Sequence, residues 1–355
     1  MPLVAHNNLP TFQRLTEEGQ TVLGKNRAHT QHIREQHIGL LNMMPDAAIQ
    51  ATERQFYRLV GESNPIVQIY MHPFTLPELE RSQKAQAHID QYYETFEDIQ
   101  LDGLDALIIT GANVTQPNLS DEVFWEPLTK VFEWAHNNVA SVLCSCLATH
   151  AIMEFAHGQK RRHMSNKRWG VYPHHVTDKS HPLVRDINTR FDVPHSRFNQ
   201  VDRSQFENAN VKILCESEEA GVHLAVSEDG IQTVYFQGHP EYDVISLLKE
   251  YKREIMRFIK GDLNAPPPFP DHYFDDITKA IFREYLQKIA EALACHSEIP
   301  EFPESLIIDH LYNTWHDTGE AVIGNWLGLV YQLTNPDRTL RFMDGVDPNN
   351  PLESL

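Results

Sequence analysis

Cysteine is scarce in this sequence of 355 residues, which contains four: Cys144, Cys146, Cys215 and Cys295. They form neither a C-x-x-C pair nor the evenly paired framework of a disulfide-stapled secreted protein. A C-x-C pair is also a poor zinc signature. The 20 histidines are scattered along the sequence instead of being grouped at ligand spacing. The sequence therefore predicts no metal site and no bound cofactor.

Positive charge and long apolar runs are scarce as well. Lysine and arginine total 30 against 49 aspartates and glutamates, a formal net charge of -19, which argues against nucleic acid and anionic membranes as partners. No apolar segment approaches the ~20 residues that span a bilayer. The N-terminus lacks a basic region followed by an apolar one, so it does not read as a secretory signal. We expect a soluble, acidic, cytoplasmic protein.

Short β-type runs alternate with helical patterns over the middle of the chain. Such alternation predicts an α/β fold with a doubly wound, mostly parallel sheet, in which ligand chemistry lies at the carboxyl ends of the strands. The apolar strand runs lie at residues 37–45, 65–71, 105–112 and 141–145, and helical patterns lie at residues 49–60, from Ser120 onward and at 244–259.

Three segments are expected along the chain. Residues 1–35 are polar and irregular and predict an N-terminal extension, and residues 36–263 predict the catalytic α/β domain. A proline-rich stretch then leads into residues 264–355, a helical extension packed on the catalytic domain or on a dimer partner. An apolar residue every four positions predicts its core-facing helical stripe: Ile277, Ile281, Tyr285, Ile289 and Leu293.

Cys146 is the first candidate for chemistry, because it stands where an apolar strand run ends and a helical pattern begins. A thiol on such a turn lies beside the free N–H groups of the new helix, which lower its pKa and can hold an oxyanion. The alternative is a small buried hydrophobic residue. Strand alternation alone does not separate Cys146 from Cys144, since both lie on one face.

His239 and Glu241 supply what a cysteine nucleophile needs. A strand-like run stops at Gly238 and delivers a histidine, with a glutamate two positions later. An imidazole takes the thiol proton, and a carboxylate fixes the imidazole tautomer. Considered alone, the histidine could equally lie on the surface beside a turn. Together with Cys146, it predicts a nucleophile, base and orienter.

In order and spacing, the motifs resemble those of the MetA-type homoserine O-acyltransferase family of methionine biosynthesis. The resemblance implies a sheet related to class I glutamine amidotransferases (flavodoxin-like) and a homodimer. It extends over most of the chain and rests on Cys146 and on residues 38–45, 110–112, 170–172, 194–197, 238–243 and 324–327.

The same resemblance implies roles for individual residues. Cys146 is similar to the acyl-accepting nucleophile, His239 to the general base and Glu241 to the third member of the triad. Substrate-binding roles are implied for Lys167, Ser196 and Arg253. From the residues alone, Lys167 could be a solvated charge, Ser196 a turn cap and Arg253 a surface ion-pair partner of Glu250 or Glu254.

Thr115 stands at the position that tracks acyl choice in this family, where glycine accompanies succinyl and glutamate accompanies acetyl. Threonine is uncharged and carries a donor hydroxyl, so we expect succinyl-CoA as donor and L-homoserine as acceptor. Acetyl-CoA is the alternative, and a Cys-His-Glu glutamine amidohydrolase is a second. The turn around Cys146 lacks the flanking glycines of such amidohydrolases. Two further departures are Asp46–Ala48, where many members carry lysines, and an apparent insertion at about 275–308.

Overall fold

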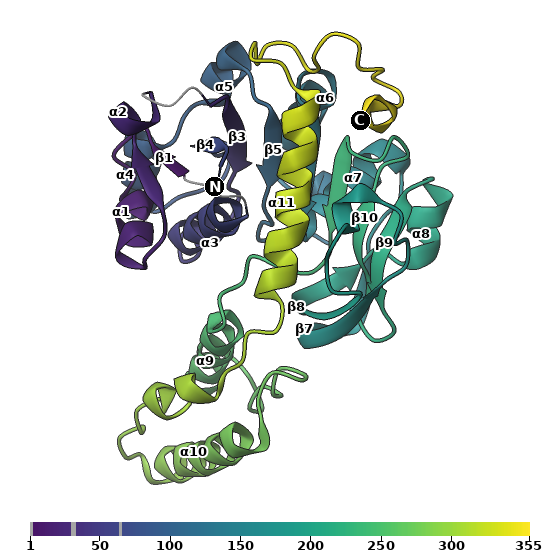
Figure 1. Ribbon diagram of the computed structural model, residues 1–355. Helices are drawn as coiled ribbons and strands as arrows, with labels where there is room; N and C mark the ends of the chain where they lie inside the picture. The colour runs from purple at the N-terminus through teal and green to yellow at the C-terminus, as the bar shows by residue number, and fades with distance from the viewer. Residues whose placement is uncertain (1–2, 30–32, 64–65) are drawn as a thin grey trace.

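A computed structural model describes residues 3–29, 33–63 and 66–355, which build one 11-stranded sheet with helices on both faces (Figure 1). The strand order is β2-β1-β4-β3-β5-β6-β11-β10-β9-β7-β8. The strands from β2 to β11 in this order pair parallel, and those from β11 to β8 pair antiparallel. The predicted α/β fold with a mostly parallel sheet is therefore confirmed.

The parallel core has the flavodoxin-like order β4-β3-β5-β6-β11. Its strands are apolar throughout because helices cover both faces. One face packs on α1, α3 and α11, and the other on α5, α6 and α7. The core strands are β3 (Glu35–Leu41), β4 (Gln68–Phe74), β5 (Ala106–Ile109), β6 (Ser141–Ser145) and β11 (Thr233–Phe236), and the helices between them are α3 (Ile49–Glu62), α4 (Gln83–Tyr92), α5 (Phe96–Asp102), α6 (Trp125–Asn138) and α7 (Leu147–His157).

The antiparallel half extends the sheet beyond β11. Its long strands β7 and β8 pair over most of their length and shift register between His163 and Arg168. The elements of this half are β7 (Arg162–Val176), β8 (Arg190–Gln200), α8 (Arg203–Asn208), β9 (Lys212–Ser217) and β10 (Gly221–Val226).

The N-terminal segment differs from the irregular extension predicted for residues 1–35. Its described part contains β1 (Leu3–Ala5), α1 (Pro10–Glu17), β2 (Val22–Gly24) and α2 (Lys25–Ala28). Strand β1 pairs with β4 and so continues the main sheet. The apolar residues of α1 join the core beneath that sheet. The polar sequence does not predict these short elements, because their burial depends on packing against β4, which lies much later in the chain.

Two helix expectations also need correction. The helix expected from Ser120 begins at Trp125, and a 3-10 turn precedes it at Leu119–Asp121. In α10 (Asp276–Cys295), Tyr285 and Ile289 are buried as expected, but Ile277 and Leu293 are exposed. An exact four-residue repeat rotates about 40° per step around an α-helix, so its ends drift off a common face.

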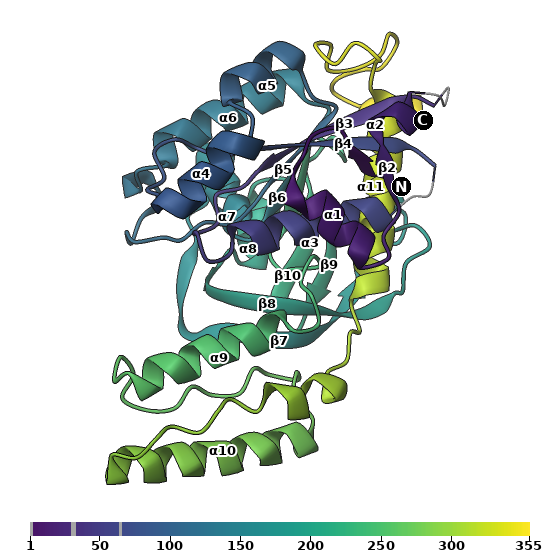
Figure 2. The same cartoon turned by 90° about the vertical axis from the view of Figure 1, so that its left-hand side faces the viewer.

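The C-terminal part of the chain first leaves the main body and then returns to it. Helices α9 (Ser246–Ile259) and α10 form an arm, residues 246–312, whose apolar side chains cluster with Trp169 and Val171 of β7. Both views show the arm projecting below the sheet (Figures 1 and 2). Helix α11 (His316–Leu333) then packs on the face shared with α3. Trp326 is fully buried there, and its Nε1 donates to Ser141 Oγ at 2.7 Å. None of the described helices is long and apolar enough to cross a bilayer.

Candidate active site

Cys146 lies on a tight turn between β6 and α7, with φ 51° and ψ -104°. Few residues other than glycine adopt positive φ, and such strain is typical of a strand-to-helix nucleophile elbow. The turn is held from both sides. Cys146 N–H donates to Phe236 O at 2.8 Å, and Thr149 Oγ1 donates to Cys144 O and Phe236 O. The thiol is thus fixed at the carboxyl end of β6.

Strand β11 brings the base to the thiol. Phe236 pairs with Ser145, so the residues after β11 emerge beside the elbow. His239 hydrogen-bonds the Cys146 side chain, and its Nδ1 lies 2.8 Å from Glu241 Oε1. Burial alone would lower the pKa of His239, but the charges of Glu241 and Cys146 outweigh it and raise the pKa to about 10. The imidazole thus lies between the Cys146 side chain and a carboxylate, which is the arrangement of a nucleophile, its base and the group that orients the base.

The loop carrying the base is supported by the C-terminal segment. Tyr242 stacks on His239 with ring centroids 4.3 Å apart. Trp315 Nε1 donates to Tyr242 O at 2.9 Å. At Gly319, the first turn of α11 comes so close that a Cβ there would lie 3.0 Å from Pro240 Cβ. Residues beyond 312 therefore help to position His239.

Other histidines lie nearby but cannot serve as the base. His174, His195 and His223 are buried together; His174 stacks on His195, and His223 meets both rings edge-on. Burial, with the nearby Arg197, lowers the pKa of His174 to about 4 and that of His195 and His223 further. Arg197 donates to His195, whose Nε2 lies 3.2 Å from His174 Nε2. These three neutral histidines support the loop that carries His239.

Two of the three predicted substrate residues meet at a carboxylate that the sequence did not single out. Lys167 Nζ lies 2.9 Å from Glu250 Oε2, and Ser196 Oγ donates to the same oxygen at 2.6 Å. Tyr242, the stacking partner of His239, donates to Glu250 Oε1 at 3.0 Å. Glu250 thus links the predicted substrate residues to the base. Its position in α9 resembles that of any helical glutamate, so no sequence signal marks it.

Arg253 does not join this group. It lies one turn further along α9, its side chain is 64% exposed, and its Nε lies 3.3 Å from Glu254 Oε1. This matches the surface pairing that the sequence left open as the alternative.

Thr115 is tied to a buried glutamate. Thr115 Oγ1 donates to Glu122 Oε2 at 3.2 Å, and the N–H groups of Thr115 and Gln116 donate to Glu122 Oε1 at 2.5 and 2.7 Å. The hydroxyl expected to face the acyl group is therefore already donating. Glu122 was predicted to lie in the first turn of a helix, and the later start of α6 frees it to cap this loop.

A cation lies close to this loop. Burial lowers the pKa of Arg161, while the charges of Glu122, Glu154 and Cys146 act in the opposite direction. The guanidinium is thus within electrostatic range of Glu122, which holds the Thr115 loop, and of Cys146. Its buried Nε has no hydrogen-bond partner in the described part of the chain.

The loops after β3 and β5 form the remaining wall. Met43 N–H donates to Thr110 Oγ1 at 2.9 Å, which joins the two loops. A Cβ at Gly111 would lie 4.0 Å from Leu147 Cβ, so this loop faces the elbow. Asp46, in the segment where the sequence departs from the expected family pattern, accepts from Ser82 N–H at 2.7 Å. Asp46 therefore stabilises a local turn.

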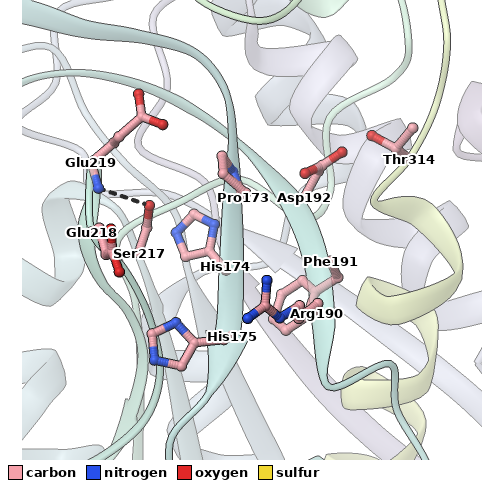
Figure 3. A pocket seen from close by; sticks show the side chains of 10 residues that line it. All are labelled: Pro173, His174, His175, Arg190, Phe191, Asp192, Ser217, Glu218, Glu219 and Thr314. Carbon is pink, nitrogen blue, oxygen red and sulfur yellow. Dashed lines mark hydrogen bonds between the residues drawn. The ribbon is translucent and has the colours of Figure 1, made fainter.

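A cavity of about 510 Å³ lies elsewhere, against β7 and β8 (Figure 3). Figure 3 shows acidic side chains at its rim, including Asp192 and Glu219, opposite Arg190 and His175. None of Cys146, His239 and Glu241 is among its ten lining residues. It is separate from the candidate active site.

Comparison with known proteins identifies the family. A family model described as homoserine O-succinyltransferase matches residues 2–336. The chain belongs to the homoserine O-succinyltransferase family. A protein of that name from Thiobacillus denitrificans is 63% identical over 354 residues, and one from Allochromatium vinosum is 62% identical over 352; each match covers 99% of both chains. The homoserine acyltransferase resemblance seen in the motifs is confirmed.

Solved structures that resemble this chain include two glutamine amidotransferases. The one from Thermotoga maritima has a TM-score of 0.45 at 10% identity and covers 84% of this chain and 99% of its own. The one from Methylobacillus flagellatus has a TM-score of 0.44 at 10% identity, with 83% and 95% covered.

Proposed function

We propose that this homoserine O-succinyltransferase family member transfers a succinyl group from succinyl-CoA to the hydroxyl of L-homoserine through an acyl-cysteine. The observation that carries the proposal is the placement of His239 between the Cys146 side chain and Glu241 Oε1, at the ends of adjacent strands. Cysteine, base and carboxylate suffice for acyl transfer, so we propose that no resident cofactor takes part.

In the first half-reaction, the Cys146 thiolate attacks the thioester carbonyl. A new C–S bond forms, and N–H groups at the start of α7 stabilise the oxyanion. The carbonyl reforms as the C–S bond to coenzyme A breaks, and the His239 imidazolium gives its proton to the departing thiolate. The result is succinyl-Cys146 beside a neutral imidazole.

In the second half-reaction, His239 removes the proton of the homoserine hydroxyl, and the oxygen attacks the succinyl-cysteine. Collapse releases O-succinylhomoserine and restores the thiolate–imidazolium pair. We propose that Glu250 and Ser196 bind the α-ammonium of homoserine and that Lys167 binds its carboxylate. The polar hub at Glu250 supports this, because it is connected to His239 through Tyr242.

Acyl choice is proposed to depend on the Thr115 loop and Arg161. The Arg161 guanidinium can pair with a succinyl carboxylate, and its buried Nε has no partner among the described residues. One observation favours acetyl instead: Glu122 holds a carboxylate beside Thr115, although three donors bind it.

Release of coenzyme A tests the proposal. Mixing the protein with succinyl-CoA alone should give about one equivalent of free thiol and a succinyl adduct by intact mass. Adding homoserine should give continuous turnover with ping-pong kinetics. Parallel reactions with acetyl-CoA and with glutamine test the two alternatives. Faster turnover with acetyl-CoA, or ammonia release from glutamine without acyl transfer, would replace the proposal by that alternative.

We also propose a cytoplasmic homodimer that contacts neither nucleic acid nor membrane. The net charge of -19 supports the latter part. A second copy is supported by large apolar side chains exposed on the arm: Met256, Ile277, Leu293, Leu306, Ile308 and Tyr312. Light scattering coupled to size exclusion should give twice the chain mass of 40.9 kDa. A measured mass equal to that of one chain would contradict the dimer.

A further inference from the structure

Three side chains far apart in the sequence converge at the edge of the parallel sheet. His6 follows β1, His72 lies within β4, and Glu94 follows α4. Each offers one ligand atom, and these atoms lie within 4.8 Å of one another. His72 Nδ1 is 2.8 Å from Glu94 Oε1. This cluster is remote in sequence from the catalytic residues, and the proposed reaction does not use it.

Hydrogen bonding around His37 fixes the proton on His72. His37 Nδ1 accepts from Arg338, because a guanidinium can only donate. The same Nδ1 lies 2.8 Å from His72 Nε2. His72 Nε2 must therefore be a donor, which leaves Nδ1 as the atom facing Glu94.

His72 Nδ1 faces a carboxylate oxygen of Glu94 2.8 Å away. Two acceptors at this distance repel unless a cation lies with them, either a proton or a metal ion.

His6 favours the metal ion. Its Nδ1 lies 3.1 Å from Val4 O and must donate to that carbonyl, so its Nε2 carries a lone pair. The contact at that atom is a long one, 3.4 Å from Asn7 Nδ2. A backbone carbonyl that fixes the tautomer of a ligating histidine is the usual support of a metal site.

We propose that His6, His72 and Glu94 bind one divalent transition-metal ion of the zinc class, which joins β1 to β4 and the segment after α4. Two imidazoles and a carboxylate suit zinc, with a fourth position left for water. Tetrahedral ligands about 2.05 Å from zinc lie about 3.3 Å apart, so His72 and Glu94 separate slightly on binding. The Glu94 side chain is 27% exposed, which gives an ion access from solvent.

The sequence predicted no metal site because these ligands are 66 and 22 positions apart, a spacing outside every short ligand motif. Only the parallel pairing of β1 with β4 brings His6 beside His72.

Zinc binding by the full-length protein tests the proposal. The measurements use a Cys146→Ser background, so that the active-site thiolate cannot bind the metal. Calorimetric titration with Zn²⁺ should show one saturable site, and saturating Zn²⁺ should raise the unfolding temperature by about 3 °C or more. Co²⁺ should give a visible spectrum without a thiolate charge-transfer band.

Variants locate the site. His6→Asn and Glu94→Gln should each weaken Zn²⁺ binding by at least about tenfold and abolish the rise in unfolding temperature. His29→Ala, which removes an exposed histidine from the same N-terminal segment, should change neither. Circular dichroism of the metal-free variants verifies that they are folded. Absence of a saturable site, or equal binding by wild type and both ligand variants, would overturn the proposal and leave a proton between His72 and Glu94.

Discussion

At the scale of single residues, Cys144 and Cys146 are two positions apart but lie in opposite environments. Cys144 is fully buried in β6, and burial raises the pKa of its thiol. Cys146 lies at the turn, partly exposed and in contact with His239. Strand alternation could not separate them, because the decisive feature is the positive φ of Cys146, which lifts it out of the strand.

Replacing the two cysteines separately should therefore give opposite results. Cys146→Ser should lower transfer by at least about 10³-fold, because serine has no thiolate for His239 to stabilise. Cys144→Ala should remain within about threefold of wild type and lose roughly 1 kcal/mol of stability. Peptide mapping after exposure to succinyl-CoA locates the adduct, and an adduct on Cys144 alone would contradict the assignment.

Thr115 raises the question of whether charge or size sets the acyl preference. We expect wild-type kcat/KM for succinyl-CoA to exceed that for acetyl-CoA by at least about tenfold, or about 1.4 kcal/mol. Thr115→Glu should erase or reverse this ratio, since a second carboxylate beside Glu122 repels a succinyl tail.

Thr115→Gln is the matched control, because it has nearly the same size as glutamate without the charge. It should retain a preference for succinyl-CoA. If both variants lose the preference equally, volume rather than charge decides the donor; if neither does, selectivity lies outside this loop.

At the scale of elements, the proximity of Cys146 and His239 could be predicted because each follows its own strand. The ends of adjacent parallel strands lie together, so Cys146 after β6 and His239 after β11 had to meet. Glu250 and Glu122 could not be predicted in this way. Each acts through a partner from a distant segment, and a helical or near-helical glutamate has no distinctive local pattern. The sequence predicts the helix of the arm. It does not predict all of the buried face, because an apolar residue every four positions exceeds the 3.6 residues of a helical turn.

The turn between β11 and His239 gives an element-scale prediction. A Cβ at Gly238 would lie 2.5 Å from Val193 Cγ1 and 2.8 Å from His195 Cε1, and both neighbours are buried. Gly238→Ala should shift His239 and lower kcat by about 10- to 100-fold. Gly328→Ala in α11 has open space around it and should leave kcat unchanged while stabilising the fold by about 0.5–1 kcal/mol. Normal kcat in Gly238→Ala would show that the turn tolerates the shift.

At the scale of the whole molecule, the active site should contribute to the pH dependence of stability. The pKa of His239 is raised from 6.5 to about 10 by folding. Its stabilising contribution is therefore fully present below pH 6.5 and is lost as the pH rises toward 10. The free energy of unfolding of wild type should exceed that of His239→Gln most at pH 6, and the difference should shrink steadily up to pH 10.

Urea denaturation at unit pH intervals measures this difference. His136→Gln, which replaces an exposed histidine on α6, is the control and should show no comparable trend. A wild-type advantage that stays constant between pH 6 and 10 would contradict the raised pKa.

The return of α11 to the sheet also affects how the chain is made. Gln36, at the start of β3, donates to Leu327 O in α11, 291 positions later. Strand β3 and the helix share one hydrophobic cluster. At about 5–20 residues per second on the ribosome, roughly 15–60 s separate the synthesis of these partners. During that time the nascent chain exposes the apolar face that α11 will cover, so its folding is completed after translation and it should be a client of chaperones that shield such surfaces.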